Sequence, residues 1–282
     1  MTERMADISA RIEGIRQLGA VVNAMKGIAA ARANAARTQV KAVDSYALTI
    51  AQAMSRAIGP GDRPARDTAE KDPRKTGLLV FCAEQGFAGA FSERVLDSID
   101  EDRAAASLFL IGSRGFSVAK ARDLEPGWSA AMPSHTPGLP KLADQITQAI
   151  FDQVAKGGIE RLDVLYTWWD AGRPTVRRQT LFPIDLADLP TVDEDPPMTQ
   201  LPLDALIDSL GQNYLHALIC KAALHAFAAE NEARMEAMSS AGTQIERELE
   251  TFQAELRRVR QEAITAEIIE LGTGATSARG AR

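Results

Sequence analysis

The fold is decided by residues 8–50, which read ISARIEGIRQLGAVVNAMKGIAAARANAARTQVKAVDSYALTI. Stepping by seven from the first of them meets only apolar residues: Ile8, Ile15, Val22, Ala29, Ala36, Val43 and Ile50. A seven-residue apolar repeat of this length predicts a helix that winds around a partner helix. Leu18, Met25 and Tyr46 are expected to fill part of a second stripe beside it. We therefore predict a coiled-coil helix over residues 1–58, on the order of 80 Å long.

A second proline-free segment, residues 203–271, supplies the partner helix. Pro202 stands just before it, where a helix start tolerates proline. From residue 235 onward, apolar side chains recur in steps of three and four, interrupted at Gly242. They are Met235, Met238, Ile245, Leu249, Phe252, Leu256, Val259, Ala263 and Ala266. Because both helices join the same middle segment at their inner ends, we expect them to pair antiparallel.

The middle segment, residues 76–190, has a different pattern. Short apolar runs typical of buried strands alternate with helical stretches, which predicts a small, Rossmann-like, mostly parallel α/β domain. The expected strands are 77–82, 107–112, 161–169 and 175–182, and the expected helices are 92–103, 116–122 and 139–156. Residues 59–75 are interpreted as a solvated linker, 191–202 as an extended connection and 272–282 as a flexible tail. The fold class is thus mixed α and β, with a long antiparallel coiled coil and one α/β domain.

Composition excludes several classes of protein. The chain has 282 residues and a formal charge of -6, which disfavours a general nucleic-acid binder. No run approaches the roughly 18 apolar residues of a membrane span, and the charged N-terminus lacks the apolar core of a signal peptide. The only cysteines, Cys82 and Cys220, suit a reducing compartment.

No residues assemble into a catalytic, metal or cofactor site. Gly86-Phe-Ala-Gly89, after the first expected strand, is the only candidate phosphate loop, but it lacks G-x-G-x-x-G, and no G-K-[ST] occurs in the chain. A tight turn that needs glycine is the simpler interpretation. The histidines, His135, His216 and His225, are too scattered to bind a metal, and neither cysteine has a partner at ligand spacing.

Three separated segments resemble the γ subunit of F-type ATP synthases. Residues 24–32, AMKGIAAAR, are similar to its N-terminal signature, 230–238, ENEARMEAM, to a block in its second helix, and 260–268, RQEAITAEI, to its C-terminal signature. The 21 residues between the last two match the family spacing without a gap. Gly86–Phe91 resembles the glycine-rich turn of the family's middle domain. The motifs, in the family's order, extend over nearly the whole chain.

The resemblance implies a non-catalytic central rotary stalk that couples ion flow through a membrane ring of c subunits to ATP synthesis or hydrolysis on β subunits. Its implied partners are the α and β subunits, the ε subunit and the c-ring, and it needs no cofactor of its own. The implied location is peripheral, on the cytoplasmic face of the bacterial inner membrane. The residues that match the family's contacts with the β subunit are Met25, Lys26, Arg260, Gln261, Thr265 and Glu267.

Some stretches depart from the family pattern. Leu18–Asn23 replaces a Thr-Gln-Lys-Ile-Thr run, Glu84-Gln85-Gly86 stands where Asp-Arg-Gly is usual, and Leu256-Arg257 replaces a Tyr-Asn pair. These departures favour a divergent branch, such as an alternate operon-borne enzyme. Two other functions stay open: a coiled-coil adaptor with an α/β head outside the ATPase, and a dinucleotide-dependent enzyme that uses the Gly86 turn.

Overall fold

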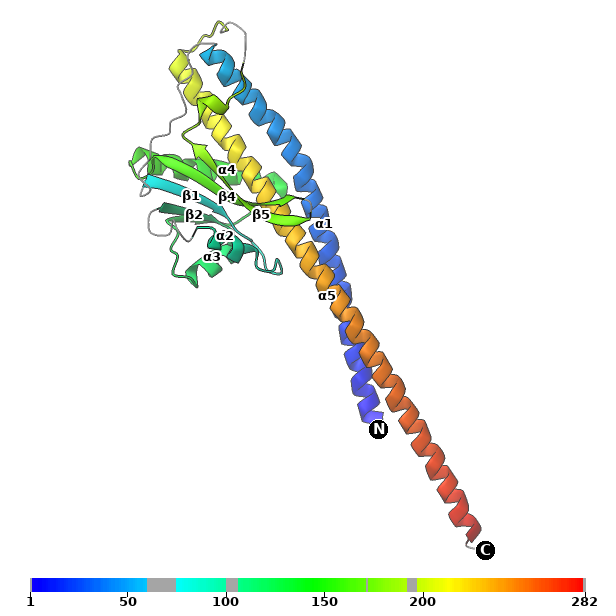
Figure 1. Ribbon diagram of the computed structural model, residues 1–282. Helices are drawn as coiled ribbons and strands as arrows, with labels where there is room; N and C mark the ends of the chain where they lie inside the picture. Colours follow the sequence, from blue (N-terminus) through cyan, green and yellow to red (C-terminus); the bar gives the residue numbers. More distant parts are fainter. Residues whose placement is uncertain (1, 60–74, 100–105, 171, 192–196, 281–282) are drawn as a thin grey trace. The chain divides into compact units, whose positions relative to one another are not determined.

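The computed structural model describes residues 2–59, 75–99, 106–170, 172–191 and 197–280. The described chain forms two compact units, one made of Met1–Ile28 with Met235–Arg282 and the other of Ala29–Arg234. Two long helices, α1 (Thr2–Ile58) and α5 (Leu203–Gly280), contribute to both units (Figure 1). The predicted linker lies almost wholly outside the described residues, as do residues 192–196 of the predicted connection and 281–282 of the predicted tail.

The unit Ala29–Arg234 contains a five-stranded sheet in the order β3-β2-β1-β4-β5. The strands are β1 (Thr76–Phe81), β2 (Ala106–Ile111), β3 (Trp128–Ala130), β4 (Arg161–Asp170) and β5 (Arg173–Phe182). Strands β1 to β4 run parallel to one another, and β5 pairs with β4 in the antiparallel direction. This order confirms the prediction of a mostly parallel Rossmann-like domain, and the strand order reverses beside β1, where such sheets place ligands.

Helices cover both faces of this sheet (Figure 1). α4 (Leu139–Ala155) packs on one face together with parts of α1 and α5, while α2 (Phe91–Asp97) and α3 (Ser113–Lys120) pack on the other. Alternate residues of β1 point to opposite faces, so that Leu79 joins the first layer and Val80 the second. Because helices cover both faces, the inner strands β1 and β2 are largely apolar, as the sequence indicated, whereas the edge strand β5 is mostly polar and exposed.

In this unit α1 and α5 run antiparallel against each other. Asp44 pairs with Lys221, their oxygen and nitrogen 2.6 Å apart, and Arg37 pairs with the buried Glu232. α1 ends at Ile58, and the next residue, Gly59, has a φ of 80° that suits a glycine after a helix end and an N–H that donates to the Ser55 carbonyl.

The unit Met1–Ile28 with Met235–Arg282 is a two-helix pair. Ile8 and Ile12 of α1 pack with Val259 of α5, and Val22 packs with Met238 and Ile245. Residues of increasing number along α1 thus contact residues of decreasing number along α5, which confirms the antiparallel coiled coil. All seven residues of the first predicted stripe are buried or half-buried.

The second predicted stripe is wrong by one residue. Leu18 is 53% exposed and Tyr46 50% exposed, and only Met25 is half-buried. The stripe that is buried or half-buried runs instead through Met5, Ile12, Gly19, Ala33, Val40, Ala47 and Met54, and is interrupted by the exposed Lys26. Glycine lies on it because the helices approach closely there: a Cβ at Gly19 would stand 3.3 Å from the Ile245 Cγ2.

Two further expectations differ from the structure. Ala266 is exposed although it continues the α5 stripe: the core shared with Ile8 and Ile12 of α1 lies at Val259, seven residues before it. The helix α5 also continues to Gly280, past the predicted end at residue 271, since no proline interrupts its hydrogen bonding.

Candidate partner-binding surface

The residues predicted to contact a partner all lie in the two-helix unit, but at two separate levels. Met25 and Lys26 lie on α1 at the level of Met238 and Ser239 of α5. Arg260 lies 21 residues further along α5, which is about 30 Å at 1.5 Å per residue. The structure therefore does not gather the predicted residues into one site.

At the first level the two neighbours differ in environment. The Met25 side chain is half-buried against Val22, Met238 and Ile245. Lys26 is exposed, and its Nζ donates a 3.1 Å hydrogen bond to the Ser239 Oγ on the other helix. Lys26 thus links the two helices through its side chain.

At the second level, Arg260, Gln261, Thr265 and Glu267 are all exposed on α5. Large apolar side chains accompany them: Ile264 is 51% exposed, Ile268 64% and Leu271 70%. Spacings of four and three place these three residues on one helix face. A contiguous exposed apolar stripe is typical of a surface that another protein covers.

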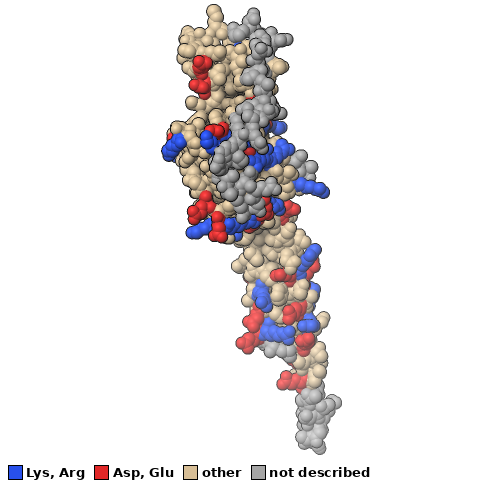
Figure 2. All heavy atoms as spheres, turned by 60° about the vertical axis from the view of Figure 1, so that its left-hand side comes forward, with Lys and Arg blue, Asp and Glu red and all other residues tan. Residues whose placement is uncertain are grey.

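Sequence reasoning missed this apolar stripe, although a signal for it was present. Ile264, Ile268 and Leu271 follow one another in steps of four and three, on a face beside the stripe that ends at Ala263 and Ala266. The charged residues of the unit form exposed ion pairs, such as Arg4 with Glu255, 3.2 Å apart. Acidic and basic side chains are interspersed on the face of the molecule in Figure 2, which is typical of solvated surface rather than of a nucleic-acid interface.

The two cysteines of the chain, Cys82 and Cys220, are buried. Burial raises the pKa of the Cys82 thiol to about 12 and that of Cys220 to about 11, so both stay protonated at neutral pH. His216, 3.1 Å from an Asp144 oxygen, lies beside Cys220 with ring nitrogens 3.9 and 4.0 Å from its sulfur, but the protonated thiol is inert.

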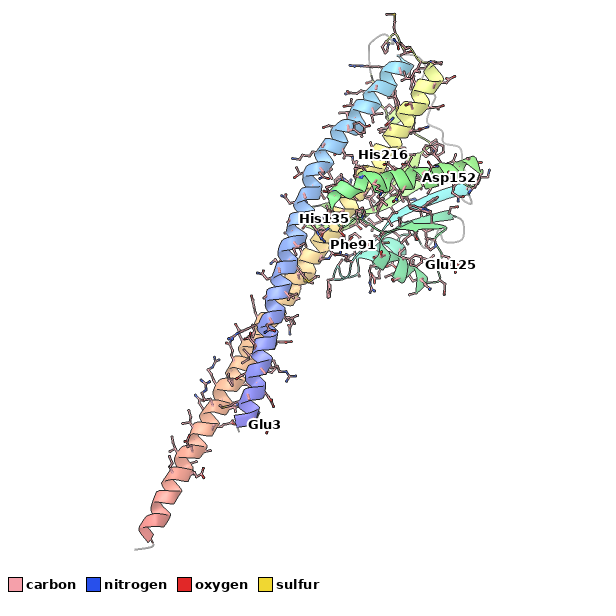
Figure 3. All side chains as sticks on the ribbon, turned by 180° about the vertical axis from the view of Figure 1, so that it is seen from behind. Glu3, Phe91, Glu125, His135, Asp152 and His216 are labelled. Carbon is pink, nitrogen blue, oxygen red and sulfur yellow. The ribbon has the colours of Figure 1, made fainter. Side chains whose placement is uncertain are left out.

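The candidate phosphate loop lines an open cavity of about 320 Å³ formed by residues 83, 85–89, 92, 93 and 114. Glu93 and Arg114 are both among its lining residues, so the cavity carries side chains of both charges. His135 and His216 come from different elements: His135 precedes the turn that leads into α4, and His216 lies in α5 (Figure 3). Among the described residues there is no group of three or more side chains placed to hold a metal ion.

Within the described part of the chain, no helix is long and apolar enough to cross a membrane.

The architecture defines a class: an antiparallel two-helix coiled coil whose helices also pack on a doubly wound α/β domain. The family model for ATP synthase matches residues 4–278. An ATP synthase gamma chain of Moorella thermoacetica is 27% identical over 286 residues, covering 96% of this chain and 98% of the relative. One from Pelodictyon phaeoclathratiforme is also 27% identical, covering 96% of this chain and 97% of the relative.

The chain therefore belongs to the ATP synthase gamma family, and its role is that of a central stalk subunit. Solved structures share the fold. A chain of the Euglena gracilis mitochondrial ATP synthase matches with a TM-score of 0.67 at 14% identity, covering 100% of this chain and 97% of the other. A central-stalk chain from the Tetrahymena thermophila enzyme matches with a TM-score of 0.58 at 19% identity, covering 78% and 99%. The family's gamma subunit is a non-catalytic part of the stalk.

Proposed function

We propose that this subunit couples ion flow through a membrane c-ring to ATP synthesis or hydrolysis on β subunits, by rotating within a ring of α and β subunits. The observation that carries the proposal is the exposed face of α5 beyond its pairing with α1. There Ile264, Ile268 and Leu271 need a protein partner to shield them from water, and polar side chains flank them. A subunit enclosed by a ring of partners meets that need.

The two levels of predicted contact suit a rotating shaft. Met25 and Lys26 would meet the β subunits at one height, and Arg260, Gln261, Thr265 and Glu267 at another. A pair of helices presents different side chains around its circumference, so each surrounding β subunit would meet a different surface and be biased toward a different conformation. This is a coupling of one rotating surface to several two-state partners.

ATP chemistry would take place on the partner β subunits. Two features support this division of roles: the protonated state of both thiols, and the lack of a G-x-G-x-x-G or G-K-[ST] motif in the sequence. The α/β domain and the connection at 191–202 would engage the ε subunit and the c-ring. The complex would then hold this chain peripherally at the cytoplasmic face of a bacterial inner membrane.

Co-purification tests the proposal. A tagged chain should isolate α and β subunits in fixed stoichiometry, together with ε and c. Changing Ile264, Ile268 and Leu271 together to Asp should reduce the recovery of α and β at least tenfold, because three carboxylates would have to be buried in the contact. The matched control changes the exposed Thr243, Thr251 and Arg258 of the same helix to Asp and should leave recovery unchanged. A well-folded chain that isolates neither α nor β would instead favour the adaptor function.

A further inference from the structure

The carboxyl ends of β1, β2 and β3 form an edge at which backbone N–H groups converge. In doubly wound sheets the turn after the first strand, beside the point where strand order reverses, is the usual place for a bound phosphate. In this chain the backbone N–H groups of that edge already donate to carboxylates, and the carboxylates belong to the chain itself.

Glu230 of α5 occupies the turn after β1. Its Oε2 accepts from the Glu84 N–H at 3.1 Å, and its Oε1 accepts from the Gln85 N–H, also at 3.1 Å. The Arg234 guanidinium, one helical turn along α5, pairs with the same carboxylate. Glu230 is 3% exposed and Arg234 5% exposed. Two backbone amides and a guanidinium around one buried anion are the donors that proteins use to bind a phosphate or sulfate.

The remaining donors of Arg234 fix the turn more firmly. Its Nε donates to the Gly86 carbonyl at 3.2 Å, and its Nη1 donates to the Asn231 Oδ1 at 3.0 Å. The space left among these groups is about 10 Å³, no more than a single water needs. The position is therefore filled by the carboxylate and does not remain as an open pocket.

Glu84 repeats the arrangement at the next two strands. Its carboxylate accepts from the Ser113 N–H at 2.9 Å and the Ser113 hydroxyl at 2.8 Å, at the start of α3 after β2. It also accepts from the Met132 N–H at 2.8 Å, just after β3. Hydrogen bonds thus join the carboxyl edge of the sheet to α5. Glu230 connects α5 to the turn after β1, and Glu84 in that turn connects it to the residues after β2 and β3.

We propose that Glu230 is an internal substitute for an oxyanion: its carboxylate occupies a phosphate-type site formed by the Glu84 and Gln85 amides and the Arg234 guanidinium, and so holds α5 on the sheet. Two consequences follow. The native chain leaves no room for a phosphate at this position. Removing the carboxylate opens a site that takes a tetrahedral oxyanion, such as inorganic phosphate or sulfate.

The test is the melting temperature of the full chain with Glu230→Ala, in sodium chloride and in sodium phosphate or sulfate of equal ionic strength. In chloride the variant should melt about 5–10 °C below the wild type, because two amides and a buried guanidinium lose their acceptor. Phosphate or sulfate should restore at least half of that loss. Adding Arg234→Ala to the variant should abolish the response to phosphate.

Glu232→Ala is the matched control. Glu232 is also a buried carboxylate of α5, 5% exposed, but its partner is the side chain of Arg37. This variant should gain no more from phosphate than the wild type does. Equal gains in the two variants, or a Glu230→Ala chain that melts like the wild type in chloride, would overturn the proposal.

If Glu230→Ala fails to fold, Glu230→Gln and hydrogen exchange of the wild type decide the matter. Gln keeps one acceptor oxygen, so the Gln variant should fold and should melt at a lower temperature than the wild type. In the wild type, the Glu84 and Gln85 amides should exchange as slowly as the amides of β1. Rapid exchange at both amides would contradict the proposed bonding.

Discussion

The two compact units are stabilised by cores of different thickness. In Ala29–Arg234, Leu79, Ile146 and Val164 are fully buried between the sheet and its helices, each 0% exposed. In the two-helix unit the most buried side chains are Val259 at 1%, Met238 at 4% and Ile12 at 5% exposed. A sheet covered on both faces buries many side chains in large clusters, whereas two paired helices bury only the few along their line of contact. The comparison teaches that stability concentrates in one unit, while the other leaves most of its surface available to partners.

Their polar groups differ in the same way. In the α/β unit, Asp163 is fully buried and accepts from Arg161, Arg178 and Thr180. Burial opposes its ionisation, but those hydrogen bonds outweigh burial and hold its pKa below the ordinary value. The ion pairs of the two-helix unit are exposed, and such pairs contribute little each. Polar contacts thus fix the arrangement of the first unit more than that of the second.

The largest expected difference between the units comes from truncating one core residue in each. Leu79→Ala should lower the free energy of unfolding by about 2–5 kcal/mol, since the enclosed site cannot collapse around the cavity. Val259 is almost as well buried, at 1% exposed, but Val259→Ala should cost only about 1–2 kcal/mol because the two helices can move together over the space that is left. Urea denaturation followed by circular dichroism measures both. Equal losses would mean that the helix pair has a core as rigid as that of the sheet.

A smaller effect is expected from acid. The His225 ring stacks on Trp168, with centroids 3.9 Å apart, and its Nε2 is buried without a hydrogen-bond partner among the described residues. Burial first, and the charge of Lys221 second, lower the pKa of His225 to about 4. The charges of Asp44, which raises it, and Arg177, which lowers it, contribute less.

Because the unfolded histidine titrates near 6.5, the unfolded chain takes up this proton more readily. The stability that neutral His225 contributes is complete above pH 6.5 and is lost as the pH falls toward 4. His225→Phe, which keeps a ring and does not titrate, should reduce the loss of melting temperature between pH 7 and pH 4.5. An identical loss in both proteins would show that other groups cause the acid sensitivity.

The same substitution of glycine by alanine should have opposite signs in the two units. At Gly14 of α1 nothing lies within 4 Å of an added Cβ, so Gly14→Ala should stabilise by about 0.5–1 kcal/mol through helix propensity. At Gly115 of α3 the added Cβ would lie 2.0 Å from the Cys82 Cβ, and Gly115→Ala should destabilise by about 1–3 kcal/mol. Thermal melts of the two variants check this, and a stabilised Gly115→Ala would show that α3 moves freely against β1.

Much of this fold was predictable because its strongest signals are periodic. The stripe from Ile8 to Ile50 and the alternation of strands and helices each repeat over many residues, so single errors do not change the result. β3 was missed because Trp128–Ala130 is three residues long and only partly buried, and so shows no period. The second stripe of α1 was misplaced because Leu18 appears more apolar than Gly19, whereas close helix contact requires the smaller residue.

The buried charges were the least predictable part. Glu230 and Arg234 stand in a helical segment with a polar sequence, which predicts a solvated face. Their burial depends on the β1 turn, about 145 residues away in sequence, and no local pattern reports such a contact. The predicted partner-contact residues came from resemblance alone, and they remain a proposal.

The central claim is that the helix pair transmits rotation to the β subunits, and Met25→Lys tests it most directly. Met25 is half-buried against apolar side chains, so a lysine there would turn its ammonium outward toward a partner carboxylate. A bias of about 1.4 kcal/mol toward one rotary position would change its population tenfold. The measurement is the ratio of ions pumped to ATP hydrolysed by the complex in vesicles, with Ala10→Lys, exposed on the same helix, as control. We predict a lower ratio for Met25→Lys with hydrolysis retained, and an unchanged ratio would contradict the account.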